Sequence, residues 1–493
     1  MSGGDRGGQV RPFSPPISAT LADRSESVTI DKLPDDALLE TFDFCKEGFE
    51  NYPHLPWKWQ TLTHVCRKWR HIILASPPRL DLRVLCNAKT PAMTRMSLNT
   101  VWPHIPITIT SYPPGKMDAQ GEENVIAALE QRGRVAEIVL VGQTRTTLER
   151  FAAAMEEPLP ALIHLNIESD HVTAATFPDA FLGGSAPRLR SIALEGISFP
   201  ALPNLVLSAS YLQSLYLHDI PHAGYISPHE MVAFLHALPN LQFLIIGFKS
   251  PQSRPLQITP PPSMRAVLPA LTDFRFKGVS EYLEDFVARI DTPLFDRLWM
   301  TLFLDLVFDL PRLFEFIGRT ERLKPIDQAE MKLSPWGIQA VFGSPTGLLT
   351  DALELEIACG VSDWQVSSMA RVCNQIVPLL SHVERLDICE SFWNLTEWQD
   401  DTDPTLWLEL LNPFVSVKSL YVSEKLVRLV ASALRELAGE RVAEVLPALH
   451  DLFLEGLQPS GSVQEAISPF IAARQFSDHP IAIQRWDRMP ESR

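Results

Sequence analysis

The sequence predicts an α/β protein in which a short N-terminal pair of helices precedes a long, irregular solenoid of alternating strands and helices. Two patterns support this prediction. Apolar residues recur at helical spacing over 38–42 and 59–73, and an apolar triplet at positions i, i+3 and i+5 recurs from residue 135 onward. The 493 residues leave room for about three domains, or for one long array with a small module.

Charge and hydropathy limit the classes of partner. The 43 Lys and Arg against 59 Asp and Glu give a net charge of −16, which disfavours neutralisation of phosphates, so we expect no nucleic-acid partner. The most apolar window, 298–310, is interrupted by Asp305 and Asp309 and is shorter than the roughly 20 residues that cross a bilayer. We therefore expect no membrane span.

Composition and cysteine spacing do not favour a catalytic loop or a metal site. Prolines (41) outnumber glycines (23), which favours proline-bounded elements over glycine-rich catalytic loops. The six cysteines are far apart and include no C-x-x-C pair, so no zinc site is expected. In a chain of this length they are expected to be free thiols of a reducing compartment. Because the N-terminus also lacks the apolar segment of a secretory signal, we expect a cytoplasmic or nuclear protein.

The predicted helical pair begins after a polar tail. Residues 1–29 are rich in Gly, Pro, Ser and charge, and are predicted to be disordered. Pro34 suits the first turn of a helix, and Asp35 adds the negative charge that the helix dipole favours there. A second run of apolar residues three and four apart covers 59–73 and stops before Pro77.

These two helical segments resemble the F-box family motif. LPDDALLETF supplies its Leu-Pro opening and helical leucines, and LTHVCRKWRHII supplies its Val-Cys-x-x-Trp-Arg segment, in the same order. The loop over 46–58 is longer and more aromatic than the usual pattern. The resemblance implies that this segment binds the Skp-type adaptor of a cullin-based ubiquitin ligase. The residues implied at the adaptor are Leu33, Pro34, Leu38, Leu39, Phe42, Leu62, Val65, Cys66, Trp69, Arg70 and Ile72.

Physical reasoning points the same way, because so short a helical pair cannot bury its whole apolar face against itself. Part of that face is expected to contact a partner. The alternative is that these residues pack entirely on the repeats that follow.

The solenoid prediction rests on the triplets. Eleven of them lie between Val135 and Leu454, and they resemble the L-x-x-L-x-L spine of a leucine-rich repeat. Most begin 23 to 34 residues apart, but Phe295 and Ala352 are 57 apart (352 − 295), so one unit is expected to be hidden in or deleted around 315–348. The Asn or Cys that usually follows the spine is absent. An α/β protein whose short strands merely share a pattern is therefore the alternative.

The predicted organisation has five parts. They are a disordered tail over 1–29, the F-box over 30–78, a linker or cap over 79–134, leucine-rich-repeat-like units over 135–475 and a C-terminal tail over 476–493. The linker contains an alternating Ile107-Thr108-Ile109 that indicates a strand, which we expect to cap the first repeat. The Pro-rich stretch over 250–263 and the segment 320–348 are predicted to be insertions at the loop edge.

Catalytic motifs are missing. No G-x-S-x-G elbow, P-loop, G-x-G-x-x-G or H-E-x-x-H pattern occurs. His64 and His71 can share one helix face, but they have no third ligand. We expect no catalytic residue, no metal and no cofactor, and the protein is not expected to be an enzyme.

Binding residues are predicted on the other side of the repeat strands. Spine residues face the core, so the residues between them face outward on the concave side. Tyr, Trp and Arg are enriched at binding hot spots. The residues expected to bind a protein substrate are Tyr216, Arg275, Lys277, Trp299, Arg385, Tyr421 and Phe453. Ordinary surface is the alternative for each of them singly.

These expectations combine into one function. The chain is predicted to be the substrate-recognition subunit of an SCF (Skp–cullin–F-box) ubiquitin ligase, holding a Skp-type adaptor, and through it a cullin, with residues 30–78 and an unknown protein substrate with the repeats. Two alternatives remain: an adaptor-binding scaffold or regulatory interaction protein that does not direct ubiquitination, and an enzyme with a site hidden at the loop edge.

Overall fold

The structure is a computed structural model in which the chain divides into two compact units, residues 1–82 and 83–493. The predicted tail over 1–29, most of the loop over 46–58 and most of the Pro-rich insertion lie outside the described residues. The described residues are 30–47, 59–87, 89, 103–111, 117–170, 172, 174–254, 264–303, 309–320, 323, 326–343, 353–359, 361–391, 403–437, 441, 443–458, 461–477 and 479–487.

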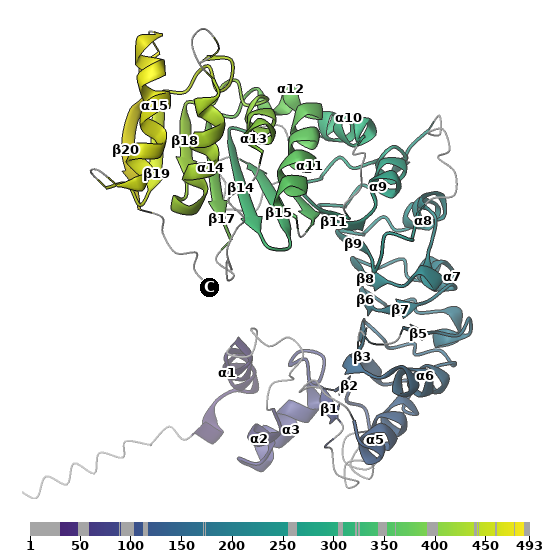
Figure 1. Ribbon diagram of the computed structural model, residues 1–493. Helices are drawn as coiled ribbons and strands as arrows, with labels where there is room; N and C mark the ends of the chain where they lie inside the picture. Colours follow the sequence, from purple (N-terminus) through teal and green to yellow (C-terminus); the bar gives the residue numbers. More distant parts are fainter. Residues whose placement is uncertain are drawn as a thin grey trace, which may run out of the picture. The chain divides into compact units, whose positions relative to one another are not determined.

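The N-terminal unit is helical, as the periodicity predicts (Figure 1). Its elements are η1 (Ile30–Lys32), α1 (Asp35–Glu47), α2 (Trp59–Thr63) and α3 (Arg67–Ala75). The second predicted helix is thus two helices, because residues 64–66 form a turn between α2 and α3. Cys66 caps α3, since its Sγ accepts a hydrogen bond from the amide of Trp69 at 3.4 Å.

Helices α1 and α3 pack through their apolar faces. Leu38, Phe42 and Ile72 are buried, and the rings of Phe42 and Trp69 meet edge to face with centroids 5.0 Å apart. Lys68 joins the start of α1 to α3, because its Nζ donates to the carbonyl oxygen of Leu33 at 2.7 Å. The apolar face predicted from sequence is therefore largely the core of this unit.

The C-terminal unit is built on one sheet of sixteen strands within the described part of the chain, in the order β1-β2-β3-β4-β6-β8-β9-β11-β13-β16-β15-β14-β17-β18-β19-β20. Two small two-stranded sheets, β5–β7 and β10–β12, accompany it. The strands are β1 (Val84–Asn87), β2 (Ile107–Thr110), β3 (Val135–Gln143), β4 (His164–Ser169), β5 (Ala175–Thr176), β6 (Ser191–Glu195), β7 (Ile197–Ser198), β8 (Ser214–Ile220), β9 (Phe243–Phe248), β10 (Ala266–Val267), β11 (Asp273–Gly278), β12 (Ile290–Asp291), β13 (Arg297–Phe303), β14 (Gln328–Ser334), β15 (Gly337–Gly343), β16 (Leu353–Ala358), β17 (Arg385–Glu390), β18 (Ser419–Val422), β19 (Asp451–Glu455) and β20 (Ala482–Trp486).

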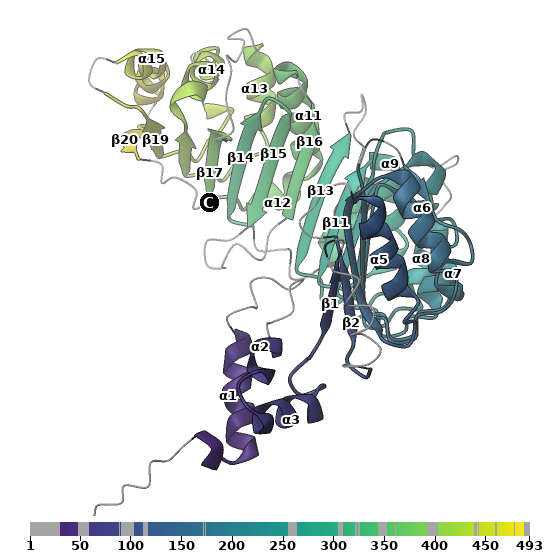
Figure 2. The same cartoon turned by 90° about the horizontal axis from the view of Figure 1, so that it is seen from below.

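Helices connect most neighbouring strands and cover one face of the sheet, so that the other face, here called the open face, is left uncovered by them (Figures 1 and 2). The helices are α5 (Ala119–Leu129), α6 (Arg145–Ala154), η2 (Phe181–Gly184), α7 (Leu202–Leu207), η3 (His222–Gly224), α8 (Pro228–Leu235), α9 (Ser280–Val287), α10 (Pro311–Arg319), α11 (Ser362–Gln375), α12 (Val377–Leu380), α13 (Pro404–Leu411), α14 (Glu424–Arg435) and α15 (Ser462–Phe476). Within the described ranges, every helix is too short or too polar to cross a bilayer.

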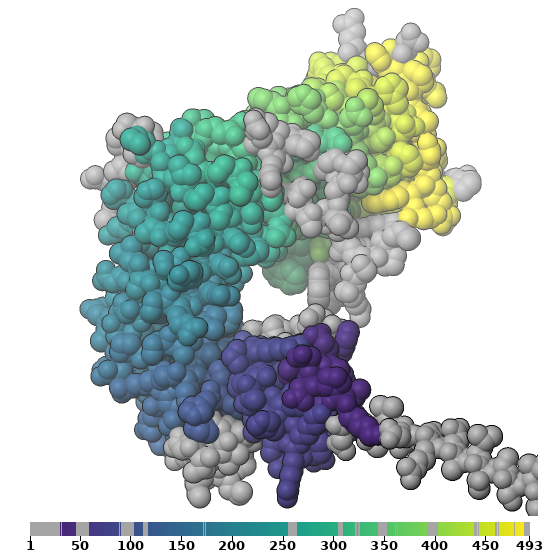
Figure 3. All heavy atoms as spheres, turned by 180° about the vertical axis from the view of Figure 1, so that it is seen from behind, coloured from purple at the N-terminus to yellow at the C-terminus, as the bar shows by residue number. Residues whose placement is uncertain are grey.

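The triplets form the core between sheet and helices. In β8, Leu215 and Leu217 are buried on the helix side, whereas Tyr216 between them is half-buried on the open face. Successive strand–helix units pack directly on one another, and the colour changes gradually along the unit (Figure 3). The α/β class and the strand–helix repeat are confirmed.

The 57-residue gap between triplets contains a β-hairpin whose second strand is antiparallel to its neighbours. A strand is present there, since β14 carries a triplet with a small residue in the middle (Ile326, Ala329, Met331) and pairs parallel with β17. No helix follows it. The chain instead turns at Ser334 and runs back as β15, which pairs antiparallel with both β14 and β16.

The turn of this hairpin needs a glycine. Ser334 Oγ accepts hydrogen bonds from the amides of Trp336 at 3.2 Å and Gly337 at 3.1 Å. A Cβ at Gly337 would lie 2.4 Å from the carbonyl oxygen of Ile357 on β16, so only glycine fits beside that strand. Residues 328–343 are thus part of the sheet, whereas the sequence predicted a loop-edge insertion over 320–348.

The sheet also extends beyond the predicted 135–475 at both ends. Strands β1 and β2 pair with each other, and β2 pairs with β3, so the segment predicted as linker or cap supplies the first strands. At the other end β20, within the predicted C-terminal tail, pairs parallel with β19. Each end strand satisfies the backbone groups of an otherwise bare sheet edge.

Helix α9 holds buried carboxyl groups. The N-terminus of α10 lacks a capping side chain of its own, since Leu310 occupies that position. Glu284 on α9 supplies the acceptors, because its Oε2 accepts from the amide of Arg312 at 3.0 Å and its Oε1 from the amide of Leu313 at 2.8 Å. Burial nevertheless raises the pKa of Glu284, and these two hydrogen bonds only partly offset it.

Removing the charge of Glu284 should therefore change how stability depends on pH. A carboxyl whose folded pKa is raised stabilises the fold most at acidic pH, and that contribution is lost as pH rises through the folded pKa. We expect the free energy of unfolding of the wild type, minus that of Glu284→Gln, to fall between pH 4 and pH 8. Urea titrations at several pH values measure it. An increase over this range would contradict the assignment.

Candidate functional site

The predicted substrate-binding residues lie on the open face, and five of them fall in one row across the strands. Tyr216, Ile245, Arg275, Trp299 and Glu354 are register partners on β8, β9, β11, β13 and β16. The row continues over the hairpin and reaches β17, β18 and β19. It ends at Gln484 on β20 after Asp387, Tyr421 and Phe453.

A pocket of about 310 Å³ opens in the first half of this row. Arg275, Lys277 and Trp299, three of the predicted residues, line it together with His218 and Asp219. Strands β8, β11 and β13 supply these side chains because the alternate positions between the buried spine residues point to the same face. The structure thus brings together residues that are up to 81 positions apart in the chain (299 − 218).

Below the pocket rim, one buried carboxylate holds two arginines. The side chain of Asp273 is 5% exposed; its Oδ1 lies 3.3 Å from Arg275 Nε and its Oδ2 lies 2.9 Å from Arg297 Nε. The guanidinium carbon of Arg275 also lies 4.9 Å from the ring centre of Trp299, in cation–π contact. We call Asp273, Arg275 and Arg297 the arginine triad. Its formal charge is +1.

The other charged groups of the pocket, which include Glu195, add no net positive charge. Lys277 Nζ lies 2.7 Å from Asp219 Oδ1. Burial lowers the pKa of His218, and the nearby carboxylates of Glu195 and Asp219 only partly oppose this, so the imidazole is neutral at pH 7. The arginine triad, of which Arg275 lines the pocket, is therefore the group here with positive charge in excess.

A second group lies at the far end of the row. The guanidinium of Arg385 is held by Asp387 in a two-bond fork at 2.8 and 2.7 Å, and its central carbon lies 4.0 Å from the ring centre of Tyr421. Phe453 stacks on Tyr421 with centroids 4.2 Å apart and an angle of 3° between the planes. Trp486 meets Tyr421 at 5.4 Å. The structure joins the predicted Arg385, Tyr421 and Phe453 into one stack.

Trp486 was not among the residues predicted from sequence. Its strand, β20, lies in the predicted tail, and the partners of the spine residues Leu452 and Leu454 there are Ile483 and Arg485, so the apolar triplet is incomplete. The apolar run Ile481-Ala482-Ile483 was the available signal.

In the N-terminal unit the structure divides the residues that the resemblance places at the adaptor. Leu38, Leu39, Phe42 and Ile72 are buried inside the unit and cannot contact a partner in this conformation. Their assignment as contact residues is corrected to core residues, since helical periodicity marks an apolar face without dividing it between core and surface. The half-buried residues are Leu33, Leu62, Cys66 and Trp69, and the exposed ones are Pro34, Val65 and Arg70.

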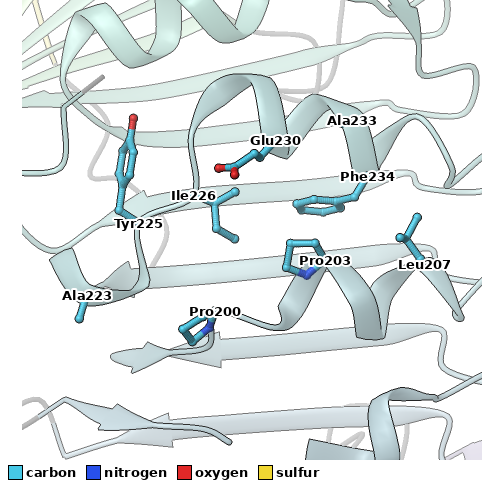
Figure 4. A pocket seen from close by; sticks show the side chains of 9 residues that line it. All are labelled: Pro200, Pro203, Leu207, Ala223, Tyr225, Ile226, Glu230, Ala233 and Phe234. Carbon is cyan, nitrogen blue, oxygen red and sulfur yellow. The ribbon is translucent and has the colours of Figure 1, made fainter. Parts of the chain in front are cut away.

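An apolar pocket of about 420 Å³ lies on the helix-covered side, between α7 and α8 (Figure 4). Pro203, Leu207 and Phe234 line it, and the hydroxyl of Tyr225 is turned away from them. Burial raises the pKa of Tyr225 to about 12. The one carboxylate that lines this pocket belongs to Glu230, which is engaged in the capping box of α8. This pocket offers no set of titratable groups that converge on a substrate.

Metal chemistry also finds no support in the described residues, since they include no group of three or more His, Cys, Asp or Glu side chains placed to hold an ion. The best-developed site is thus the open face with its arginine–aromatic contacts.

Comparisons with known proteins give likenesses among solved structures only. No model of a protein family matches this sequence, and no curated protein matches it. Among solved structures, the chain is similar to the leucine-rich repeat-containing protein LegL7 from Legionella pneumophila, with a TM-score of 0.26 and 11% sequence identity, covering 80% of this chain and 98% of that one.

Proposed function

We propose that the protein is the substrate-recognition subunit of an SCF-type ubiquitin ligase, which binds a Skp-type adaptor through its N-terminal unit and a target protein through the open face. In this role it performs no bond chemistry. It raises the effective concentration of target lysines near a charged ubiquitin-conjugating enzyme. The F-box resemblance of residues 33–73 is the basis for the adaptor.

The observation that carries the proposal is the division of the chain into two separate compact units with different surfaces. The small helical unit leaves apolar side chains in solvent: Phe44 is 69% exposed and Val65 is 56% exposed. Exposed apolar groups on so small a unit indicate a protein partner. The large unit presents arginine and aromatic side chains on an uncovered sheet, which suits a second partner.

Placing a charge at Val65 should disrupt adaptor binding without disturbing the fold. Because the side chain is 56% exposed, Val65→Glu leaves the core of the unit intact. A carboxylate buried in an apolar interface without a partner is costly, so we expect the affinity for a purified Skp-type adaptor to fall about tenfold or more. Isothermal titration with the full chain measures the change. Trp69→Ala is less suitable, since Trp69 packs on Phe42.

Val172→Glu is the matched control, because Val172 is 80% exposed and lies in the C-terminal unit. It should leave adaptor affinity unchanged. Equal affinity of wild type and Val65→Glu would remove Val65 from the interface, and failure of the wild type to bind the adaptor would refute the F-box reading.

Capture of the cullin separates the favoured function from its alternative. A substrate receptor should co-purify with both adaptor and cullin. A chain that captures the adaptor and never the cullin is an adaptor-binding scaffold that does not direct ubiquitination.

A further inference from the structure

We propose that the open face over β9, β11 and β13 recognises a protein segment that carries one carboxylate side chain next to an apolar side chain, with Arg275 and Arg297 binding the carboxylate and Trp299 contacting the apolar group. This inference rests on the proposed role of the open face in target binding and names the chemistry of the target.

The arginine triad has unused hydrogen-bonding capacity. Asp273 occupies the Nε atoms of Arg275 and Arg297. Among the described residues, the terminal amino groups of both guanidinium groups have no hydrogen-bond acceptor. A guanidinium presents its donors as a planar fork that matches a carboxylate. The triad can therefore accept one further carboxylate, whose single negative charge balances its +1.

The fork of Arg275 is held in place before a ligand arrives. Asp273 binds it from below and the ring of Trp299 lies against it at 4.9 Å. Side-chain ordering is one of the larger costs of forming an interface, and here the arginine is already ordered. The side chains of Arg275 and Arg297 are still 43% and 41% exposed, so a ligand can reach them.

Apolar surface lies directly beside the charged groups. Ile245 and Trp299 are the register neighbours of Arg275 on either side, and Trp299 is 37% exposed. The pocket of about 310 Å³ lies among these residues. A segment that places an acidic side chain at the triad thus brings an adjacent side chain onto Trp299 or Ile245, where an apolar group is favoured.

The surrounding charges favour a carboxylate over a phosphate group. Lys277 is already neutralised by Asp219 at 2.7 Å. Glu195 lines the pocket, and Glu354 and Glu356 follow on β16, where Glu356 accepts a hydrogen bond from Thr301 at 3.0 Å. The two negative charges of a phosphate group are more than the triad's charge of +1 can balance, and the nearby carboxylates would repel the remainder. An unmodified Asp or Glu fits the balance.

A peptide library tests this directly. The full-length chain is immobilised without adaptor and offered nine-residue peptides with Glu, Gln or phosphoserine at the centre and mixed residues around it. We expect peptides with Glu to be enriched about tenfold or more over those with Gln, since charge-assisted hydrogen bonds distinguish them. Apolar residues should be selected next to the Glu, and phosphoserine should be retained less than Glu.

Variants of the triad separate charge from folding. Asp273→Asn combined with Arg275→Gln and Arg297→Gln removes all three charges and leaves no buried ion unpaired, so the preference for Glu should disappear. Asp273→Asn alone raises the formal charge of the triad to +2. Peptides with phosphoserine should then be enriched as much as those with Glu, or more. Trp299→Ala should keep the Glu preference and lose the apolar selection.

Arg145→Gln on α6 is the control, because Arg145 is 53% exposed and lies away from the sheet face; it should behave as wild type. Equal enrichment of Glu and Gln peptides by the wild type, or phosphoserine ahead of Glu, would overturn the inference. The assay contains no adaptor, so its failure leaves the adaptor proposal standing. Loss of adaptor binding likewise leaves the peptide preference untouched.

Discussion

Replacing Asp285 by alanine should destabilise the region around α9 by about 3 to 5 kcal/mol, because it removes the carboxylate that pairs with a buried arginine. Arg289 Nη2 donates to Asp285 Oδ1 at 2.8 Å, and the two side chains are only 6% and 4% exposed. Arg312 adds a longer contact to the same oxygen at 3.7 Å. Hydrogen exchange of α9 and its neighbours, together with urea unfolding, measures the loss.

A second substitution distinguishes the ion pair from simple packing. Asp285→Leu with Arg289→Met removes both charges and keeps apolar volume, so it should recover at least about 2 kcal/mol of the loss. The exposed pair Arg145–Glu149 has the same spacing of four residues, and Glu149→Ala should cost less than about 1 kcal/mol. A double variant as unstable as Asp285→Ala would show that the charges are not the cause.

The strand–helix architecture was predictable because every spine residue must be buried wherever its unit lies in the array. Leu215 and Leu217 show why: two buried positions separated by one outward residue identify a strand from sequence alone. The hairpin was not predictable by the same means. Ala329 is too small to mark the spine of β14, and the reversal at Gly337 depends on a contact with Ile357 on another strand.

The side chains of the candidate site were predictable from sequence, but which of them lie next to one another was not. Sequence placed Arg275 and Trp299 on the outward row, and the register puts them side by side. Asp273 lies two residues before Arg275 on β11, yet it is 4% exposed and serves to hold the two arginines. Such a role depends on which strands are neighbours, and register is a long-range property that local patterns do not contain.

The helical unit shows a related limit. Spacing of three and four residues marks Phe42 in the first predicted helix and Val65 in the second as apolar-face positions alike. Packing decides that Phe42 is 1% exposed and Val65 is 56% exposed. Only the second can serve a partner, which is why the test of adaptor binding uses it.

Tyr282 is the centre of the largest aromatic cluster around α9, and its loss should have an effect comparable to that of Asp285. Its ring is fully buried, stacks on Phe276 at 5.7 Å and meets Phe248 at 4.8 Å and Tyr225 at 5.9 Å. These contacts join α9 to strands β9 and β11. Tyr282→Ala should therefore lower the free energy of unfolding by about 3 to 5 kcal/mol.

The hydroxyl group of Tyr282 allows the contribution of the hydrogen bond to stability to be separated from that of the ring. It donates to the carbonyl oxygen of Ile226 at 3.1 Å, across two repeat units. Tyr282→Phe keeps the ring and removes this bond, so it should cost only about 1 kcal/mol. In a solenoid each unit contacts mainly its neighbours, so exchange protection should fall in β9, β11, α8 and α9 and remain unchanged in β18 and β19. Uniform loss of protection across all strands would mean instead that the array unfolds as one cooperative unit.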